Sequence, residues 1–165
     1  MRLLLGLSRE IDRVNTLIGR AASWLVLAAI LVAAGLALSR RLFSVSSNAW
    51  YESQWLFFAA IVMLGAAWTL RLDRHVRIDI LVSRASPVYR RRLDIIGHAL
   101  MLIPFCVLHL WLAIPWFYRA FESGETSPNL GGLPLWPIRL VIVIGLSLLL
   151  AQAFSELIKR IAGRS

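Results

Sequence analysis

Apolar and polar positions are arranged along the chain in long blocks, not in residue-by-residue alternation. Four blocks are apolar over about the length of a membrane span, at about 21–38, 55–70, 93–118 and 140–154. An α-helix rises ~1.5 Å per residue, so about 20 residues cross a ~30 Å hydrocarbon core. No strand-like alternation competes with these blocks. The pattern therefore predicts an all-α integral membrane protein with four transmembrane helices.

The first 20 residues have a different pattern. Apolar residues recur there at spacings of three and four, while the charged residues fall largely off that stripe. The stripe comprises Leu4, Leu7, Ile11, Val14 and Ile18. Such a pattern predicts an amphipathic helix lying at the headgroup level, and a short soluble tail helix is the alternative. The segment lacks the cleavage pattern of a secretory signal, so we expect it to be retained.

Composition agrees with a membrane protein of one domain. The chain has 165 residues, of which 59% are hydrophobic, and a mean hydropathy of +0.71. Its net charge of +9 would indicate nucleic-acid binding in a soluble protein. Here the basic residues flank apolar blocks, which membrane topology explains better. The single cysteine, Cys106, excludes a disulfide within the chain and a cysteine metal site.

The distribution of basic residues predicts the orientation. Fourteen of the 18 lysines and arginines lie in the N-terminal segment, in 71–94 and in the C-terminal tail. Cytoplasmic segments carry the excess of basic residues, so we expect both termini and the 71–92 segment in the cytoplasm. The loop over 119–139 would then be periplasmic. That loop also holds two acidic residues, Glu122 and Glu125, in an otherwise basic chain.

Two further local signals concern the third span. Ser86 followed by Pro87 predicts a helix start, because serine caps and proline needs no amide partner in the first turn. Pro104 and Pro115 lie inside the span and predict kinks.

The spans offer little chemistry. Spans one, two and four have no charged residue in their interiors. We therefore expect that the protein is not an enzyme and that it has no cofactor or metal site. His98 and His109 are eleven residues apart, on one helix face and ~16 Å apart along the axis. They indicate an alternative function, that of a membrane-anchor or cytochrome-like subunit of a redox complex. A haem held by two histidines would, however, need facing histidines on other helices. We expect instead that His98 lies near the cytoplasmic interface and that His109 bonds another helix.

A third class of function is a small exporter that works alone. An ion-coupled carrier normally needs ionisable groups at membrane depth, and the apolar spans do not supply a carboxylate there. The residues therefore count against this class of function.

Individual polar and aromatic residues leave alternatives open. Glu52 lies at the start of the second span. Its negative charge either stabilises the helix by lying near the positive end of the helix dipole or contacts a partner subunit. Trp55 and Trp136 are typical of interface anchors. His75, Arg77 and Asp79 alternate with apolar residues. They form either a basic topology-setting loop or a polar cluster that binds a neighbouring chain or lipid headgroups.

At this stretch the chain resembles the small membrane subunit, DctQ-like, of tripartite ATP-independent periplasmic (TRAP) transporters. The matching features are Glu52 before the second span, Gly65-Ala66-Ala67 within it, the string from His75 to Asp79 with Leu81, and Leu133-Pro134-Leu135-Trp136-Pro137 before the last span. The resemblance covers nearly the whole chain. One departure is Arg40-Arg41-Leu42-Phe43, where the family often has Arg-Tyr before Phe.

The resemblance implies a non-enzymatic subunit of the bacterial inner membrane. Such transporters take up organic acids with a sodium gradient, and a periplasmic binding protein delivers the substrate to a large membrane subunit. The small subunit is expected to scaffold the large one and to help dock the binding protein. The candidate partner-interface residues are Glu52, Trp55, Gly65, His75, Arg77 and Asp79. The candidate periplasmic docking residues are Glu122, Glu125, Ser127 and Trp136.

Overall fold

The structure is a computed structural model that describes residues 2–44, 47–73 and 86–163. Its helices are α1 (Arg2–Phe43), α2 (Asn48–Arg71), α4 (Pro87–Gly97), the π-helix η1 (His98–Leu102), α5 (Ile103–Ser123) and α6 (Trp136–Ile161). Four helical stretches are long and apolar enough to cross a membrane: α1, α2, the continuous run from α4 through α5, and α6. The predicted all-α membrane fold with four spans is confirmed.

The ends of the third helical run follow from local residue chemistry. Ser86 caps the start of α4, and its side chain accepts a hydrogen bond from the Tyr89 amide, as the sequence predicts. At the other end Gly124 adopts a left-handed backbone with φ of 63°, which glycine adopts without steric cost and which ends α5.

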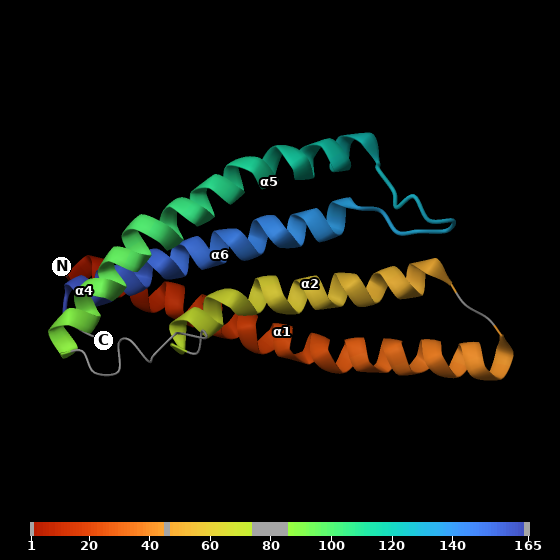
Figure 1. Ribbon diagram of the computed structural model, residues 1–165, viewed down its shortest axis with the longest axis horizontal. Helices are drawn as coiled ribbons and strands as arrows, with labels where there is room; N and C mark the ends of the chain where they lie inside the picture. The colour runs from red at the N-terminus through yellow and green to blue at the C-terminus, as the bar shows by residue number, and fades with distance from the viewer. Residues whose placement is uncertain (1, 45–46, 74–85, 164–165) are drawn as a thin grey trace.

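Toward the 124–135 loop the four spanning stretches lie side by side in the order α5, α6, α2 and α1, and toward the other end α1 crosses α6 (Figure 1). Helix α6 is the central element and packs against α1, α2 and α5. Both termini lie at one end of the molecule with α4, and the 124–135 loop lies at the other. We name these the termini end and the loop end.

Small residues let the helices approach closely. A Cβ placed on Gly19 would lie 2.5 Å from Cβ of Trp68, so α1 and α2 touch there. One on Gly145 would lie 2.6 Å from Cβ of Met63 and 2.7 Å from its carbonyl oxygen, so α6 touches α2. Such contacts are how helices pack in lipid, where no hydrophobic force draws them together.

The separate interfacial helix predicted over 1–20 is not confirmed, because α1 runs unbroken for 42 residues. Leu4, Leu7 and Val14 of the predicted apolar stripe are about half exposed. The buried positions are instead polar: Ser8 and Asn15 are each 1% exposed. This segment therefore turns its polar face inward, the reverse of a soluble amphipathic helix.

The third helical run widens into the π-turn η1 directly before Pro104. Proline lacks the amide hydrogen that an α-helical ladder needs, and a π-turn is one way to absorb that loss. The Ile103 amide accordingly bonds the His98 carbonyl, five residues earlier. In Figure 1 the run from α4 to α5 is bowed. The effect of a proline expected from the sequence thus takes the form of a π-turn.

Candidate functional site

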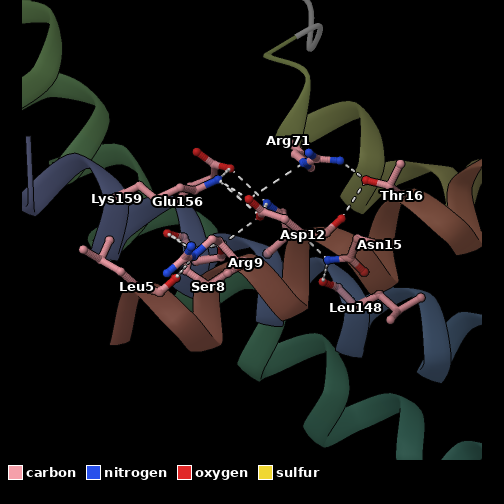
Figure 2. A network of polar contacts seen from close by, with 12 residues as sticks. Leu5, Ser8, Arg9, Asp12, Asn15, Thr16, Arg71, Leu148, Glu156 and Lys159 are labelled. Carbon is pink, nitrogen blue, oxygen red and sulfur yellow. Dashed lines mark hydrogen bonds and ion pairs between the residues drawn. The ribbon is translucent and has the colours of Figure 1, made fainter. Parts of the chain in front are cut away.

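Polar side chains from three helices gather at the termini end, and we name this group the termini-end cluster (Figure 2). Helix α1 contributes Ser8, Asp12, Asn15 and Thr16, α2 contributes Arg71, and α6 contributes Gln152, Ser155, Glu156 and Lys159. Helix α1 has a polar stripe at spacings of three and four, and so does α6. The two stripes face each other because α1 crosses α6 here.

Asp12 is the hub of the termini-end cluster. Its Oδ1 accepts hydrogen bonds from Gln152 Nε2 at 2.8 Å and from Ser155 Oγ at 3.0 Å. Its Oδ2 accepts one from Lys159 Nζ at 3.1 Å and lies 3.8 Å from Arg71 Nε. The Arg71 guanidinium also donates to the Thr16 hydroxyl. One carboxylate thus joins α1 to both α2 and α6.

Buried amides and hydroxyls extend these links. Asn15 Nδ2 donates to Gln152 Oε1 at 2.7 Å, and Gln152 Nε2 donates to Glu156 Oε1 at 2.9 Å. The Ser8 and Ser155 hydroxyls lie 2.5 Å apart. Gln152 is fully buried. Burying such groups is costly unless they are paired, and α1 and α6 supply most of the partners, although the buried Asn15 Oδ1 has none among the described residues.

Charges in the termini-end cluster balance. Asp12 and Glu156 carry two negative charges, and Lys159 and Arg71 carry two positive ones. Lys159 Nζ lies 2.5 Å from Glu156 Oε1. Because the net charge is zero and the pairs share hydrogen bonds, the cluster can lie where water is scarce. Its chemistry is that of a structural tie between helices.

A second set of contacts fastens α4 to the end of α6. The Arg91 guanidinium donates to the carbonyl oxygens of Arg160 and Ile161 at 2.6 and 2.8 Å. Arg160 itself pairs with Asp94 of α4 and lies 3.7 Å from Asp73. Arginine near a helix C-terminus satisfies its last carbonyls, so these contacts cap α6 and hold the start of the third run.

At the loop end Glu52 organises the 124–135 loop. Its Oε1 accepts hydrogen bonds from the Ser127 hydroxyl and from Asn129 Nδ2, the latter at 2.8 Å. Its Oε2 accepts one from the Leu133 amide at 2.6 Å. Gly132 leaves room for this arrangement, since a Cβ there would lie 2.6 Å from Cβ of Ser127 and 3.0 Å from Glu52 Oε1. We name these contacts the Glu52 clamp.

Arg139 ties α5 to α6 at the same end. It is 6% exposed, its Nη2 lies 2.8 Å from Glu125 Oε2, and its Nη1 donates to the Trp116 carbonyl at 3.1 Å. The guanidinium carbon also lies 4.4 Å from the centre of the Trp116 ring. A buried cation is tolerated here because a carboxylate, a carbonyl and an aromatic face surround it.

The four predicted docking residues have different contacts in the structure. Ser127 is bonded to Glu52, and Glu125 is paired with Arg139. Trp136 packs edge-on against Phe121, with ring centres 5.8 Å apart. Glu122 and Glu125 are both exposed, and of the four residues only Glu122 has no interaction with the described residues.

Sequence reasoning missed the most exposed apolar side chain of the loop. Leu130 is 94% exposed at the loop tip, while its carbonyl accepts a hydrogen bond from Asn48 Nδ2 at 3.0 Å. A single exposed leucine is common on protein surfaces, so the exposure of Leu130 only makes the residue accessible to a partner protein. The sequence signal was weak, because a single leucine in a polar loop has no pattern.

The predicted partner-interface residues divide in the same way. The Glu52 carboxylate holds the 127–133 loop, a role that the sequence did not suggest, and its contact with a partner subunit stays a prediction. Trp55 is 70% exposed, and the space around Gly65 is open, so both remain candidates for an interface. The other three, His75, Arg77 and Asp79, lie outside the described residues.

The two histidines of the third span do not share an environment. His98 is buried and its Nδ1 lies 2.7 Å from the Asp94 carbonyl oxygen. His109 is exposed, and its Nδ1 lies 2.8 Å from the carbonyl oxygen of Phe105 in its own helix. Among the described residues His109 has no hydrogen bond to another helix, so the expectation that it bonds one stays a prediction. The π-turn between them shifts the helical phase, which an α-helical count of eleven residues does not include.

The termini-end cluster was also missed by sequence reasoning. The sequence pattern shows only that the charged residues of 1–20 lie off the apolar stripe and that basic residues are frequent in the C-terminal tail. The available signal was the repeat of polar residues at spacings of three and four in two mostly apolar helices. The sequence does not show that two such stripes, some 140 residues apart, face each other.

Comparisons with known proteins agree with this architecture. The family model for the DctQ component of tripartite ATP-independent periplasmic transporters matches residues 29–163. A "C4-dicarboxylate TRAP transporter small permease protein DctQ" of Pseudomonas aeruginosa is 29% identical over 63% of this chain and 50% of its own length. A protein of the same name from Rhodobacter capsulatus is 30% identical over 57% of this chain and 40% of its own.

The aligned region thus spans half or less of the length of these curated relatives. No solved structure gives a significant match. The family match, however, extends over most of the chain and includes the loop, the clamp and all or part of each spanning helix. With its four apolar helices, the chain is a multi-pass protein of the bacterial inner membrane. The chain belongs to the family of DctQ components of tripartite ATP-independent periplasmic transporters.

Proposed function

We propose that this chain is the small permease subunit of a TRAP transporter. It scaffolds the large membrane subunit and helps dock the periplasmic binding protein during sodium-driven uptake of an organic acid. The family match over residues 29–163 carries the proposal. The names of two relatives specify C4-dicarboxylates, and for this chain we propose the broader class of organic acids.

The distribution of charge supports a scaffold. The middle parts of the spanning helices are apolar in sequence, and the ion pairs of the described residues lie toward the two ends. A carrier that couples ions to a substrate needs polar groups at membrane depth. Because this chain places its polar groups in ties between its own helices, the substrate and ion sites belong to the large subunit.

The shape supports a partner as well. The four spanning stretches leave much of their apolar surface uncovered, and large side chains are exposed on it. Trp55 and Trp111, for example, are 70% and 77% exposed. Lipid covers some of this surface, and we propose that the large subunit covers the rest.

Docking of the binding protein is proposed at the loop end. The excess of basic residues near the termini favours a cytoplasmic position for the termini end, so the loop end would face the periplasm. The Glu52 clamp holds the loop in one conformation, so Leu130 is presented without a further cost of ordering. Glu122 adds an exposed negative charge nearby in α5.

Copurification tests the scaffold role. A tagged chain extracted from native membranes in mild detergent should bring down one large polytopic protein in equal amount, identified by mass spectrometry. Recovery of the chain alone, or with a soluble redox protein, would count against the transporter subunit.

Uptake at limiting binding protein tests the docking role. Glu122→Lys and Leu130→Ser should each lower uptake and leave copurification of the large subunit unchanged. Glu10→Lys is the matched control, because it makes the same charge change on an exposed side chain near the termini end. Equal uptake in all three variants would exclude the loop end as the docking surface. Glu125 is not suitable for this test, because its reversal would also break the Arg139 pair.

A further inference from the structure

A groove runs along the exposed side of α1 and α2. Its apolar part has a volume of about 640 Å³ and is lined from α1 by Val26, Ile30 and Ala33 and from α2 by Trp55 and Phe58. The small alanine side chains of α1 leave room for the groove, and the aromatic rings of α2 form its opposite wall. The groove is open along its length, so a long, flexible apolar chain can enter it from the membrane.

The groove continues into a polar mouth at the loop end. This second hollow has a volume of about 570 Å³ and shares Ala33, Tyr51 and Gln54 with the apolar part. Arg40 and Arg41, in the last turn of α1, line it. The two hollows therefore form one site that is apolar along most of its length and basic at its end.

The mouth has a positive charge that its own lining does not neutralise. Arg40 Nη1 donates to the Tyr51 hydroxyl at 3.0 Å, which is a neutral partner. The lining residues of both hollows include no carboxylate. Glu52 is next to Tyr51 in sequence, but its two oxygens accept hydrogen bonds from the 127–133 loop. An anionic group from outside the chain therefore fits between the arginines.

We propose that this groove binds one anionic phospholipid, with an acyl chain in the apolar part and the headgroup phosphate at Arg40 and Arg41. Guanidinium groups bind phosphate oxygens with fork geometry, and the apolar part takes the chain that a soluble phosphate lacks. A helix of a neighbouring protein would need an acidic residue at the same height as the arginines. The proposal stands on the groove of this chain alone and does not depend on the transporter assignment.

Native mass spectrometry of the full chain in mild detergent measures the headgroup requirement. Titration with dioleoyl phosphatidylglycerol should give one retained lipid per chain, and dioleoyl phosphatidylethanolamine should bind more weakly. The double variant Arg40→Gln, Arg41→Gln should weaken phosphatidylglycerol about thirtyfold, from roughly 1 kcal/mol per basic residue at a membrane surface. Inorganic phosphate should not displace the lipid. Displacement by phosphate, or equal binding of the two lipids, would overturn the proposal.

The acyl-chain requirement has a matched pair of variants. Ala33→Phe fills the groove and should abolish the retained lipid, whereas Ala34→Phe is the control because Ala34 is exposed and does not line it. Both positions are on the surface, so neither change disturbs the packed core. Equal lipid retention in the two variants would overturn the proposal. So would a photocrosslinker at position 33 that captures a protein, not a lipid, in native membranes.

Discussion

Replacing Gln152 by leucine tests whether the termini-end cluster holds the helices together. The amide of Gln152 makes three hydrogen bonds, with Asn15, Asp12 and Glu156. Leucine has a similar volume and removes all three. Hydrogen bonds between membrane helices contribute about 0.6 kcal/mol on average, with a maximum of about 1.7 kcal/mol. Two of the three bonds, those with Asn15 and Asp12, cross from α6 to α1, and their loss also leaves the buried Asn15 amide without its partner. We therefore expect the free energy of unfolding to fall by roughly 2 kcal/mol, which is about thirtyfold in the equilibrium constant.

The assay is equilibrium unfolding in mixed micelles of a mild detergent and sodium dodecyl sulfate, followed by tryptophan fluorescence. Gln54→Leu is the matched control in micelles without added phospholipid, because it makes the same chemical change in α2, where the glutamine lines the groove and has no hydrogen bond to the described residues. Its unfolding free energy should change by less than about 0.5 kcal/mol, as for a surface substitution.

A double-mutant cycle then separates the hydrogen bonds from general packing. Removing Asn15 and Gln152 together should cost less than the sum of the single changes, because each single change leaves a buried amide unpaired. If Gln152→Leu is as stable as the wild type, or if the two effects are strictly additive, the cluster is not a tie between α1 and α6.

Three further predictions concern packing and the loop end. Gly145→Val should destabilise the chain by about 1–3 kcal/mol in the same assay, because the new side chain meets the Met63 backbone, whereas Gly65→Val should be tolerated in open space. Glu52→Gln should speed proteolysis of the 124–135 loop severalfold, since an amide nitrogen replaces one acceptor; an unchanged rate would refute the clamp. Arg139→Lys should also speed that cleavage, because lysine keeps the charge but cannot bond a carboxylate and a carbonyl in the same fork.

Sequence reasoning identified the elements of this protein because the membrane imposes them locally. A block of about 20 apolar residues must become a spanning helix, whatever its neighbours are, since lipid satisfies no backbone polar group. For the same reason the start of α4 at Ser86 was predictable, as it depends on a side chain and an amide three residues apart. The family resemblance also followed from the order and spacing of short motifs.

The roles of the polar residues were decided by tertiary structure. Glu52 was a candidate for a partner contact, and only the fold brings the 127–133 loop, some 80 residues later, onto its carboxylate. Asp12 lies off the apolar stripe of the predicted interfacial helix, and only the crossing of α1 and α6 encloses it between Gln152 and Lys159. A periodic pattern gives the face on which a side chain lies. What that face meets depends on how helices distant in sequence pack, because in lipid polar faces turn toward one another and apolar faces turn outward.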